Sequence, residues 1–390
     1  MSRISPFVGV LYDAARVRSL ERVTTPPYDT IGPADQRRYL SADPHNVIRI
    51  DSPEEQDGEA DEKYRRAAYW LRSWREEGVL VATPRPSYYP YEMRFSYHGA
   101  ERAIRGIVCL VELEEWGGSI LPHEQTMPGP VEDRLRLMRA TRANLSAIQS
   151  VFAGPVDPVV DLIETATATE PAAALIDEQG VEHRLWIAPV EGRDAVAEAL
   201  RDVPLTIADG HHRYTTALQY RGEMRAEHGP GPWDHVMMLL VDAVTQDLPV
   251  LPFHRVVRSG TVPVVGLRVR DLEEILSEVD DDKLRYGTAA RDEDGALEHR
   301  VAELTGEPPT VCALHEQVLT EDDPPGLTFT PDPVEAEMAV RSGEAVAAFI
   351  LPATNALRIR DVVGRGDRLP QKSTYFYPKP RTGLVLRPFD

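Results

Sequence analysis

Residues 206–221 read TIADGHHRYTTALQYR and place an acid, a glycine, two histidines and an arginine between an apolar run and a helical pattern. The apolar residues of 204–208 favour a short buried strand. The aspartate–glycine pair that begins at Asp209 is typical of a turn. The pattern from His211 onward predicts a helix that ends near Glu227, because glycines and prolines follow it. We therefore expect a strand–turn–helix unit with its polar residues at the start of the helix.

The first turn of this helix is suited to binding an anion. Backbone N–H groups without partners and the positive end of the helix dipole meet there. His211, His212 and Arg213 lie in this turn, and an arginine can hold a phosphate with two parallel hydrogen bonds. Gly210 lets the backbone approach a ligand closely. Asp209, at the strand end, is expected to face the same pocket and to bind Mg²⁺ or accept a proton.

The same residues also have a purely structural explanation. Asp209 can serve as the N-cap of the helix, and Arg213 can form a surface ion pair. We favour a functional site because several chemically capable side chains follow directly on one apolar strand. A zinc site is disfavoured, since side chains of adjacent histidines on a helix point about 100° apart.

A second candidate lies in the stretch LPHEQT, which contains His123 and Glu124. A carboxylate beside an imidazole in a loop is suited to general acid–base catalysis. The alternative is an exposed acid next to a histidine in a turn. The residues that follow, up to 148, predict a helix with four residues facing inward: Leu135, Met138, Leu145 and Ile148.

Arginines are frequent on this predicted helix. Positions 136, 139 and 142 follow an i, i+3 spacing and are expected to share a face. In an acidic chain such a stripe indicates local anion binding, with Arg139 and Arg142 as candidates. Pairing of these arginines with acids elsewhere explains the pattern equally well.

The third candidate is the segment PQKSTYFYPKPRTG, residues 370–383, which holds two of the four lysines of the chain. Lys372 is a candidate phosphate ligand, and the tyrosines of the segment can pack or stack. The alternative is an edge strand with alternating aromatic residues. A fourth stretch, PPYD at 26–29, is interpreted mainly as a turn.

Composition excludes several classes of protein. The chain has 390 residues and a formal net charge of −20, which disfavours binding to nucleic acids and to anionic membranes. Its two cysteines form no CxxC pair, and no apolar run has transmembrane length. We expect a cytoplasmic protein. P-loop, Rossmann, α/β-hydrolase and protein-kinase motifs are also missing from the sequence.

The order of predicted elements favours a mixed α/β (α+β) fold, because strands and helices alternate without a strict βαβ rhythm. We divide the sequence into an N-terminal α/β segment (1–95), a catalytic core (96–260) and an acidic C-terminal α/β segment that returns to the core (261–390).

Four motifs together resemble the DUF1015 family of bacteria and archaea. They are PPYD, LPHEQT followed by DRLRLMRATRANLS, IADGHHRYTTAL, and PQKSTYFYPKPRTGL, and the similarity runs from about Pro6 to Pro388. The DGHHR element is also similar, at a larger distance, to the GxxR phosphate-binding motif of the ParB/sulfiredoxin-like superfamily, and within it to the free-serine kinases. The resemblance implies a ParB/sulfiredoxin-like core with N-terminal and C-terminal additions.

The resemblance further implies roles for single residues. Glu124 would be the base that takes the proton from a substrate hydroxyl, with His123 beside it. Asp209 would act with Glu124, directly or through Mg²⁺, and Gly210 to Arg213 would hold the phosphates of ATP or ADP. The implied function is a nucleotide-dependent kinase of a small molecule, in the first place free L-serine. A nucleotide-binding switch without turnover and a metal-assisted phosphate-ester hydrolase are the alternatives, and the sequence leaves a homodimer open.

Overall fold

The computed structural model contains two compact units. It describes residues 3–55, 61–97, 99–124, 128–190, 192, 194–246, 248–292, 294–319 and 326–390. The first unit consists of residues 1–122, 126–247 and 378–390, and the second of residues 123–125 and 248–377. The sequence segments follow other boundaries: the one near residue 95 falls within a pair of strands, β4 and β5, that hydrogen-bond to each other.

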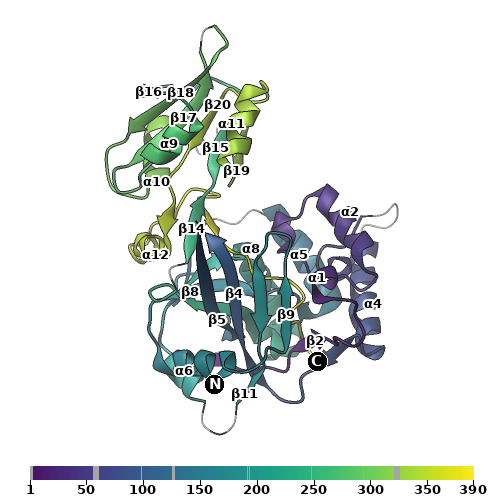
Figure 1. The fold of residues 1–390 in the computed structure, drawn as a ribbon. Coiled ribbons are helices and arrows are strands. Elements are labelled where there is room, and N and C mark those ends of the chain that lie inside the picture. Colours follow the sequence, from purple (N-terminus) through teal and green to yellow (C-terminus); the bar gives the residue numbers. More distant parts are fainter. Residues whose placement is uncertain are drawn as a thin grey trace. The chain divides into compact units, whose positions relative to one another are not determined.

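A mixed β-sheet forms the centre of the first unit (Figure 1). In spatial order its strands are β6 (Ile120–Pro122), β12 (Leu205–Asp209), β8 (Ile148–Phe152), β13 (His235–Asp242), β5 (Ala100–Glu112), β4 (Ser87–Tyr97), β10 (Glu182–Leu185) and β9 (Ala173–Ile176), with β1 (Ile4–Ser5) on β5 and β11 (Ala188–Pro189) on β4. The pairs β12–β6 and β13–β8 are parallel, whereas β12–β8 and β13–β5 are antiparallel. The predicted mixed α/β class is thereby confirmed.

Helices and two small strand pairs complete the first unit. The helices are α1 (Leu20–Val23), α2 (Pro33–Ala42), α3 (Ile48–Asp51), α4 (Glu62–Glu76), α5 (Pro128–Thr141), α6 (Asp157–Thr167), α7 (Ala195–Ala199) and α8 (His211–His228), with the 3₁₀ turns η1 (Tyr28–Thr30) and η2 (Pro232–Asp234). The strand pairs are β2 (Val10–Tyr12) with β3 (Leu80–Ala82), and β7 (Ala143–Asn144) with β23 (Arg387–Pro388).

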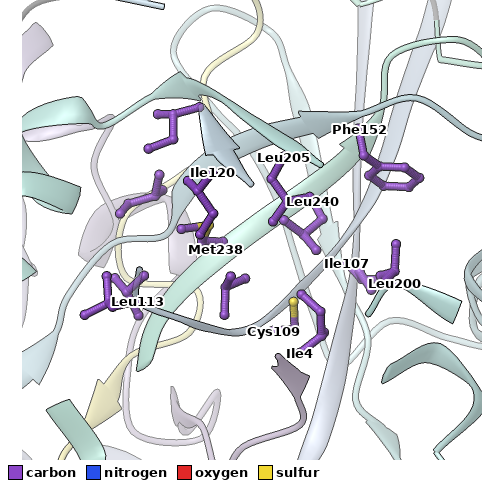
Figure 2. Close-up of a cluster of buried hydrophobic side chains, with 14 of the residues drawn as sticks. Ile4, Ile107, Cys109, Leu113, Ile120, Phe152, Leu200, Leu205, Met238 and Leu240 are labelled. Atoms are coloured by element: carbon purple, nitrogen blue, oxygen red, sulfur yellow. The ribbon is translucent and has the colours of Figure 1, made fainter. Parts of the chain in front are cut away.

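The predicted strand–turn–helix unit is confirmed as β12 and α8. Both elements contribute to one hydrophobic cluster, part of which Figure 2 shows. Leu205 and Ile207 of β12 are buried in this cluster together with Tyr214 and Ala217 of α8. Burial of a large apolar side chain contributes about 1.5–3 kcal/mol. The core therefore fixes both sides of the turn that carries Asp209 and Gly210.

The helix predicted for the residues before 148 is partly wrong. Helix α5 ends at Thr141, and Arg142 has a left-handed backbone with φ 49°. Leu145 is buried outside the helix, and Ile148 already belongs to β8. The left-handed backbone of Arg142 ends the helix, and the chain then returns to the sheet. Leu145 and Ile148 therefore continue the apolar spacing outside the helix.

The second unit contains two β-sheets. Its larger sheet has the order β16 (Leu267–Val269), β18 (Leu297–Glu303), β17 (Arg285–Arg291), β20 (Ala347–Ile350), β15 (His254–Val257), β19 (Leu327–Thr330), and the smaller one β21 (Thr354–Asn355), β14 (Pro249–Pro252), β22 (Thr374–Phe376). Its helices are α9 (Leu272–Glu278), α10 (Thr310–Leu314), α11 (Pro333–Arg341), α12 (Ala356–Gly364) and the π-helical turn η3 (His315–Leu319). Within the described residues no helix combines the length and apolar character needed to span a bilayer.

Candidate functional site

The turn between β12 and α8 depends on a glycine. Gly210 is the N-cap residue of α8 and has a left-handed backbone with φ 99°. A Cβ at this position would lie 2.9 Å from Cζ of Arg213. The first backbone bond of the helix runs from the Tyr214 N–H to the Gly210 carbonyl. The N–H groups of residues 211–213 thus occupy the first turn, where the helix itself supplies no acceptors.

Asp209 forms ion pairs with two cations. One oxygen accepts a hydrogen bond from Arg213 Nη2, and the other accepts one from Lys379 Nζ. Burial alone would raise the pKa of Asp209, but the charges of Lys379 and Arg213 outweigh it and hold that pKa well below its usual range. The N-cap alternative is wrong, because Gly210 occupies that position.

The surroundings of Asp209 do not fit a Mg²⁺ ion held by this carboxylate. Each of its oxygens already bonds a cationic side chain. Among the described residues, no cluster of three or more His, Cys, Asp or Glu side chains could hold a metal. Asp209 is therefore not suited to be the ligand of a catalytic metal ion.

Arg213 is anchored inside the first unit rather than at its surface. Its side chain is 9% exposed, which excludes the predicted alternative of a surface ion pair. Besides Asp209, its Nη1 donates to the Ala147 carbonyl at 2.6 Å and to Ser146 Oγ at 3.2 Å. The guanidinium is therefore held by β12 on one side and by the segment before β8 on the other. His211 is buried next to it and His212 is half-buried.

A second group of charges lies beside Arg213. The guanidinium of Arg134 is 4.1 Å from the centre of the Tyr28 ring, and it forms an ion pair with Asp133 at 2.6 Å. Arg134 also donates to the carbonyl of Asp51. Burial raises the pKa of Asp51, and its Oδ2 has no hydrogen-bond partner.

Asp51, Arg134 and Arg213 line a common cavity of about 40 Å³. This volume suits a few water molecules but is too small for a nucleotide. The PPYD turn and the arginine-rich helix thus meet the DGHHR turn within one unit.

The predicted arginine stripe does not form a free cationic surface. Arg136 pairs with Glu132 at 2.9 Å, and Arg139 pairs with Glu223 at 2.6 Å. Arg142 lies beyond the end of α5, so it does not continue the i, i+3 row. The alternative of pairing with acids elsewhere describes Arg136 and Arg139.

In the second unit the LPHEQT stretch meets the PQKST stretch. The His123 Nε2 and the Thr374 Oγ1 are 2.7 Å apart, and one oxygen of Glu124 accepts the backbone N–H of Lys372 at 3.0 Å. The last two residues of LPHEQT, Gln125 and Thr126, lie outside the described residues. Lys372 has a left-handed backbone with φ 51°, and its ammonium lies 5.5 Å from the centre of the Phe253 ring. β22 is an edge strand of its sheet, as the structural alternative for this segment predicted.

Pro122 marks the passage between the two units along the chain. It ends β6 and pairs with Ile207 of the parallel strand β12. The chain enters the second unit at His123, the next residue. Because β6 and β12 are parallel, Pro122 and Asp209 lie at the same end of the sheet.

The sequence analysis missed three residues of these groups. Lys379 appears above only as part of its motif. The scarcity of lysine in this chain could have indicated a specific role for it. Asp51 offered no motif at all. Gln149 of β8 lies opposite Asp209 in the sheet, is fully buried, and has no hydrogen-bond partner for either polar atom of its amide.

Two glycines of this region allow a matched test. We expect Gly210→Ala to lower the free energy of unfolding by about 1–3 kcal/mol, because a Cβ strains the left-handed backbone and displaces the side chain of Arg213. Gly222→Ala in the exposed middle of α8 meets no atom within 4 Å and should raise it by about 0.5–1 kcal/mol. Urea denaturation of both variants checks this, and a similar effect at both positions would contradict the role of Gly210.

Comparison with known proteins gives one family and several distant folds. A family model described as "Protein of unknown function (DUF1015)" matches residues 4–305. No curated protein matches the chain. Among solved structures, a free serine kinase in complex with AMP is similar at 13% identity and a TM-score of 0.37, over 71% of this chain and 91% of that one.

Two further structures are similar to a comparable degree. A conserved hypothetical protein from Pyrococcus furiosus has 13% identity and a TM-score of 0.37, over 71% of this chain and 95% of that one. SbnI from Staphylococcus aureus, with a C-terminal truncation, has 11% identity and a TM-score of 0.38, over 72% of this chain and 87% of that one.

Proposed function

The chain belongs to the DUF1015 family, and we propose that it binds a nucleotide at the start of α8 and transfers a phosphoryl group to a small hydroxyl compound. The observation that carries this proposal is the cluster of Asp209, Arg213 and Lys379 at the first turn of an 18-residue helix. A helix start of this kind favours phosphate, and both cations lie beside it.

The charge of this cluster supports anion binding. Two buried cations, Arg213 and Lys379, share the carboxylate of Asp209. Arg213 is also bonded to the main chain at Ala147, whereas Lys379 carries its charge on a flexible stem. We infer that a phosphate takes the ammonium of Lys379 as a ligand while Arg213 stays in place. Asp209 then positions both cations and is not a metal ligand.

Glu124 is the proposed general base. Phosphoryl transfer requires a positioned nucleophile, neutralisation of phosphate charge and one group to accept the hydroxyl proton. The Glu124 carboxylate is partly exposed and held by the backbone N–H of Lys372, so it is oriented and still reachable by solvent. His123, bonded to Thr374, would fix the segment that carries this base.

The acceptor and the donor are the finer parts of the proposal. Free L-serine is the first acceptor to test, because the motifs resemble those of free-serine kinases, and ATP and ADP are the donors to compare. The hydrolase alternative is not favoured, since it relies on a metal at Asp209, whose oxygens bond Arg213 and Lys379.

A ³¹P NMR time course tests the proposal. It contains protein, Mg²⁺, L-serine and either ATP or ADP, and it compares the wild type with Lys379→Met. We expect a phosphomonoester signal that grows with the wild type and much more slowly with the variant. Nucleotide signals that broaden without product would instead support the nucleotide-binding switch. Unchanged spectra with both donors would contradict nucleotide binding altogether.

A further inference from the structure

Arg255 of β15 is a fully buried arginine in the second unit. Its side chain has five N–H donors. Each of them has a neutral acceptor: His315 Nε2, the carbonyls of Phe253, Gln371 and Lys372, and Ser373 Oγ. No carboxylate among the described residues lies within 4 Å of this guanidinium. A buried charge without a direct counterion is costly, and proteins rarely keep one without a function.

The acceptors of Arg255 concentrate on one short loop. Three of them belong to the consecutive residues 371–373, and the middle residue, Lys372, has the left-handed backbone. A left-handed backbone is unfavourable for a lysine, so contacts with the surroundings must stabilise it. Arg255 supplies such a constraint, because its planar fork fixes the directions of two successive carbonyl groups.

One peptide group connects this arginine to the proposed base. The carbonyl of Gln371 accepts a hydrogen bond from Arg255 Nη2 at 3.1 Å. The N–H of Lys372 belongs to the same peptide plane and donates to Glu124 Oε1 at 3.0 Å. The C=O and N–H of a trans peptide point in opposite directions. The cation therefore polarises the carbonyl on one side, and the carboxylate receives the strengthened N–H on the other.

We propose that Arg255 is the positioning residue of Glu124 and that it orients the carboxylate through the peptide between Gln371 and Lys372. This inference rests on the proposed function for the role of Glu124 as the base. It assigns Arg255 no contact with substrate or nucleotide. Burial lowers the pKa of Arg255 to about 9, while the charge of Glu124 acts against this shift, which agrees with a coupling between the two groups.

The arrangement explains why an arginine stands at this position. A lysine has one ammonium, which cannot reach His315 and the carbonyls of Phe253 and Gln371 at once. Arg255→Lys should therefore keep the buried charge but loosen the loop. Arg255→Met should remove both the charge and the constraint. Comparison of the two variants separates the electrostatic effect from the geometric one.

The test observes the carboxylate of Glu124 itself. Protein labelled with ¹³C at the glutamate carboxyl carbons is examined by NMR, and Glu124→Gln identifies the signal of Glu124. We expect the carboxyl signal of Glu124 to move in Arg255→Met, because the carboxylate loses its fixed hydrogen bond to the Lys372 N–H, and to move less in Arg255→Lys. In turnover assays kcat should fall about ten- to a hundredfold in Arg255→Met, while the KM for nucleotide stays nearly constant.

Arg387 provides the matched control. It is also a buried arginine with neutral acceptors, namely Asn144 Oδ1 and the carbonyls of His235 and Pro232. Arg387→Met should destabilise the first unit without moving the carboxyl signal of Glu124. If Arg255→Met does not fold, Arg255→Lys carries the test with a smaller shift in the same direction.

The outcomes separate this inference from the proposed function. An unchanged Glu124 carboxyl signal in both Arg255 variants, or an equal change in Arg387→Met, overturns the positioning role whatever the protein catalyses. Wild-type turnover in Glu124→Gln instead removes the proposed base, and the NMR result for Arg255 then stands independently of it.

Discussion

Replacing Glu124 by glutamine is expected to lower kcat about 10²–10⁴-fold, the usual contribution of a general base. The backbone N–H of Lys372 can still donate to the amide oxygen of glutamine, so the side chain keeps its place. Only the ability to accept a proton is lost. Initial rates of phosphomonoester formation give kcat, and calorimetric titration with nucleotide should show a nearly unchanged Kd.

An exposed glutamate of the same unit serves as the control for this variant. Glu316 lies at the surface of the π-helical turn, and Glu316→Gln should leave kcat as in the wild type. A Glu124→Gln protein with full turnover would exclude this residue as the base. A variant that loses nucleotide binding together with turnover would indicate damage to the fold rather than to the chemistry.

The local part of the site could be predicted from the sequence. The strand before Asp209, the turn at Gly210 and the helix from His211 all depend on neighbouring residues, and β12 and α8 confirm them. Hydrophobic periodicity and turn chemistry act over a few residues, so a single sequence contains their full signal. The same holds for the mixed α/β class.

The charge pairs could not be predicted in this way. Asp209 and Lys379 are 170 residues apart, and nothing in the spacing distinguishes Lys379 from Lys372 as the residue that meets the aspartate. The sequence predicts Lys372 as the phosphate ligand, but in the structure the backbone N–H of Lys372 contacts Glu124. Tertiary contacts of single polar atoms depend on where strands end, and sequence patterns fix those ends only to within a few residues.

The failure of the arginine stripe has a similar cause. An i, i+3 row predicts a shared helix face only for residues within the helix. Helix α5 ends at the left-handed backbone of Arg142, and no glycine or proline at this position indicates the end in the sequence. Arg139 remains on the helix, but its partner Glu223 comes from α8, 84 residues away. Because acidic residues outnumber basic ones in this chain, almost any surface arginine can find an acidic partner.

Lys379→Met is expected to raise the Kd for nucleotide about 10- to 100-fold. A hydrogen bond to a charged group contributes about 1.5–3 kcal/mol, and about 1.4 kcal/mol corresponds to a factor of ten in affinity. The variant still leaves Asp209 paired with Arg213. Calorimetric titration with ATP and ADP measures the change.

Lys283→Met is the matched control for this loss of charge. Lys283 pairs with Asp280 and is 60% exposed, and surface pairs of this kind contribute at most about 1 kcal/mol. It removes one lysine from the same acidic chain without touching α8. An equal loss of affinity in both variants would mean that overall charge, and not the position of Lys379, governs binding.

Asp209→Asn should act in the opposite direction on affinity. It leaves the two cations without their carboxylate, which should lower the free energy of unfolding by about 3–5 kcal/mol. The substitution removes one negative charge beside both cations, so phosphate should bind at least as tightly as in the wild type. A metal-binding Asp209 predicts the reverse, a loss of nucleotide affinity that higher Mg²⁺ concentrations partly restore. Titration of Asp209→Asn at two Mg²⁺ concentrations therefore distinguishes an aspartate that positions cations from one that holds a metal.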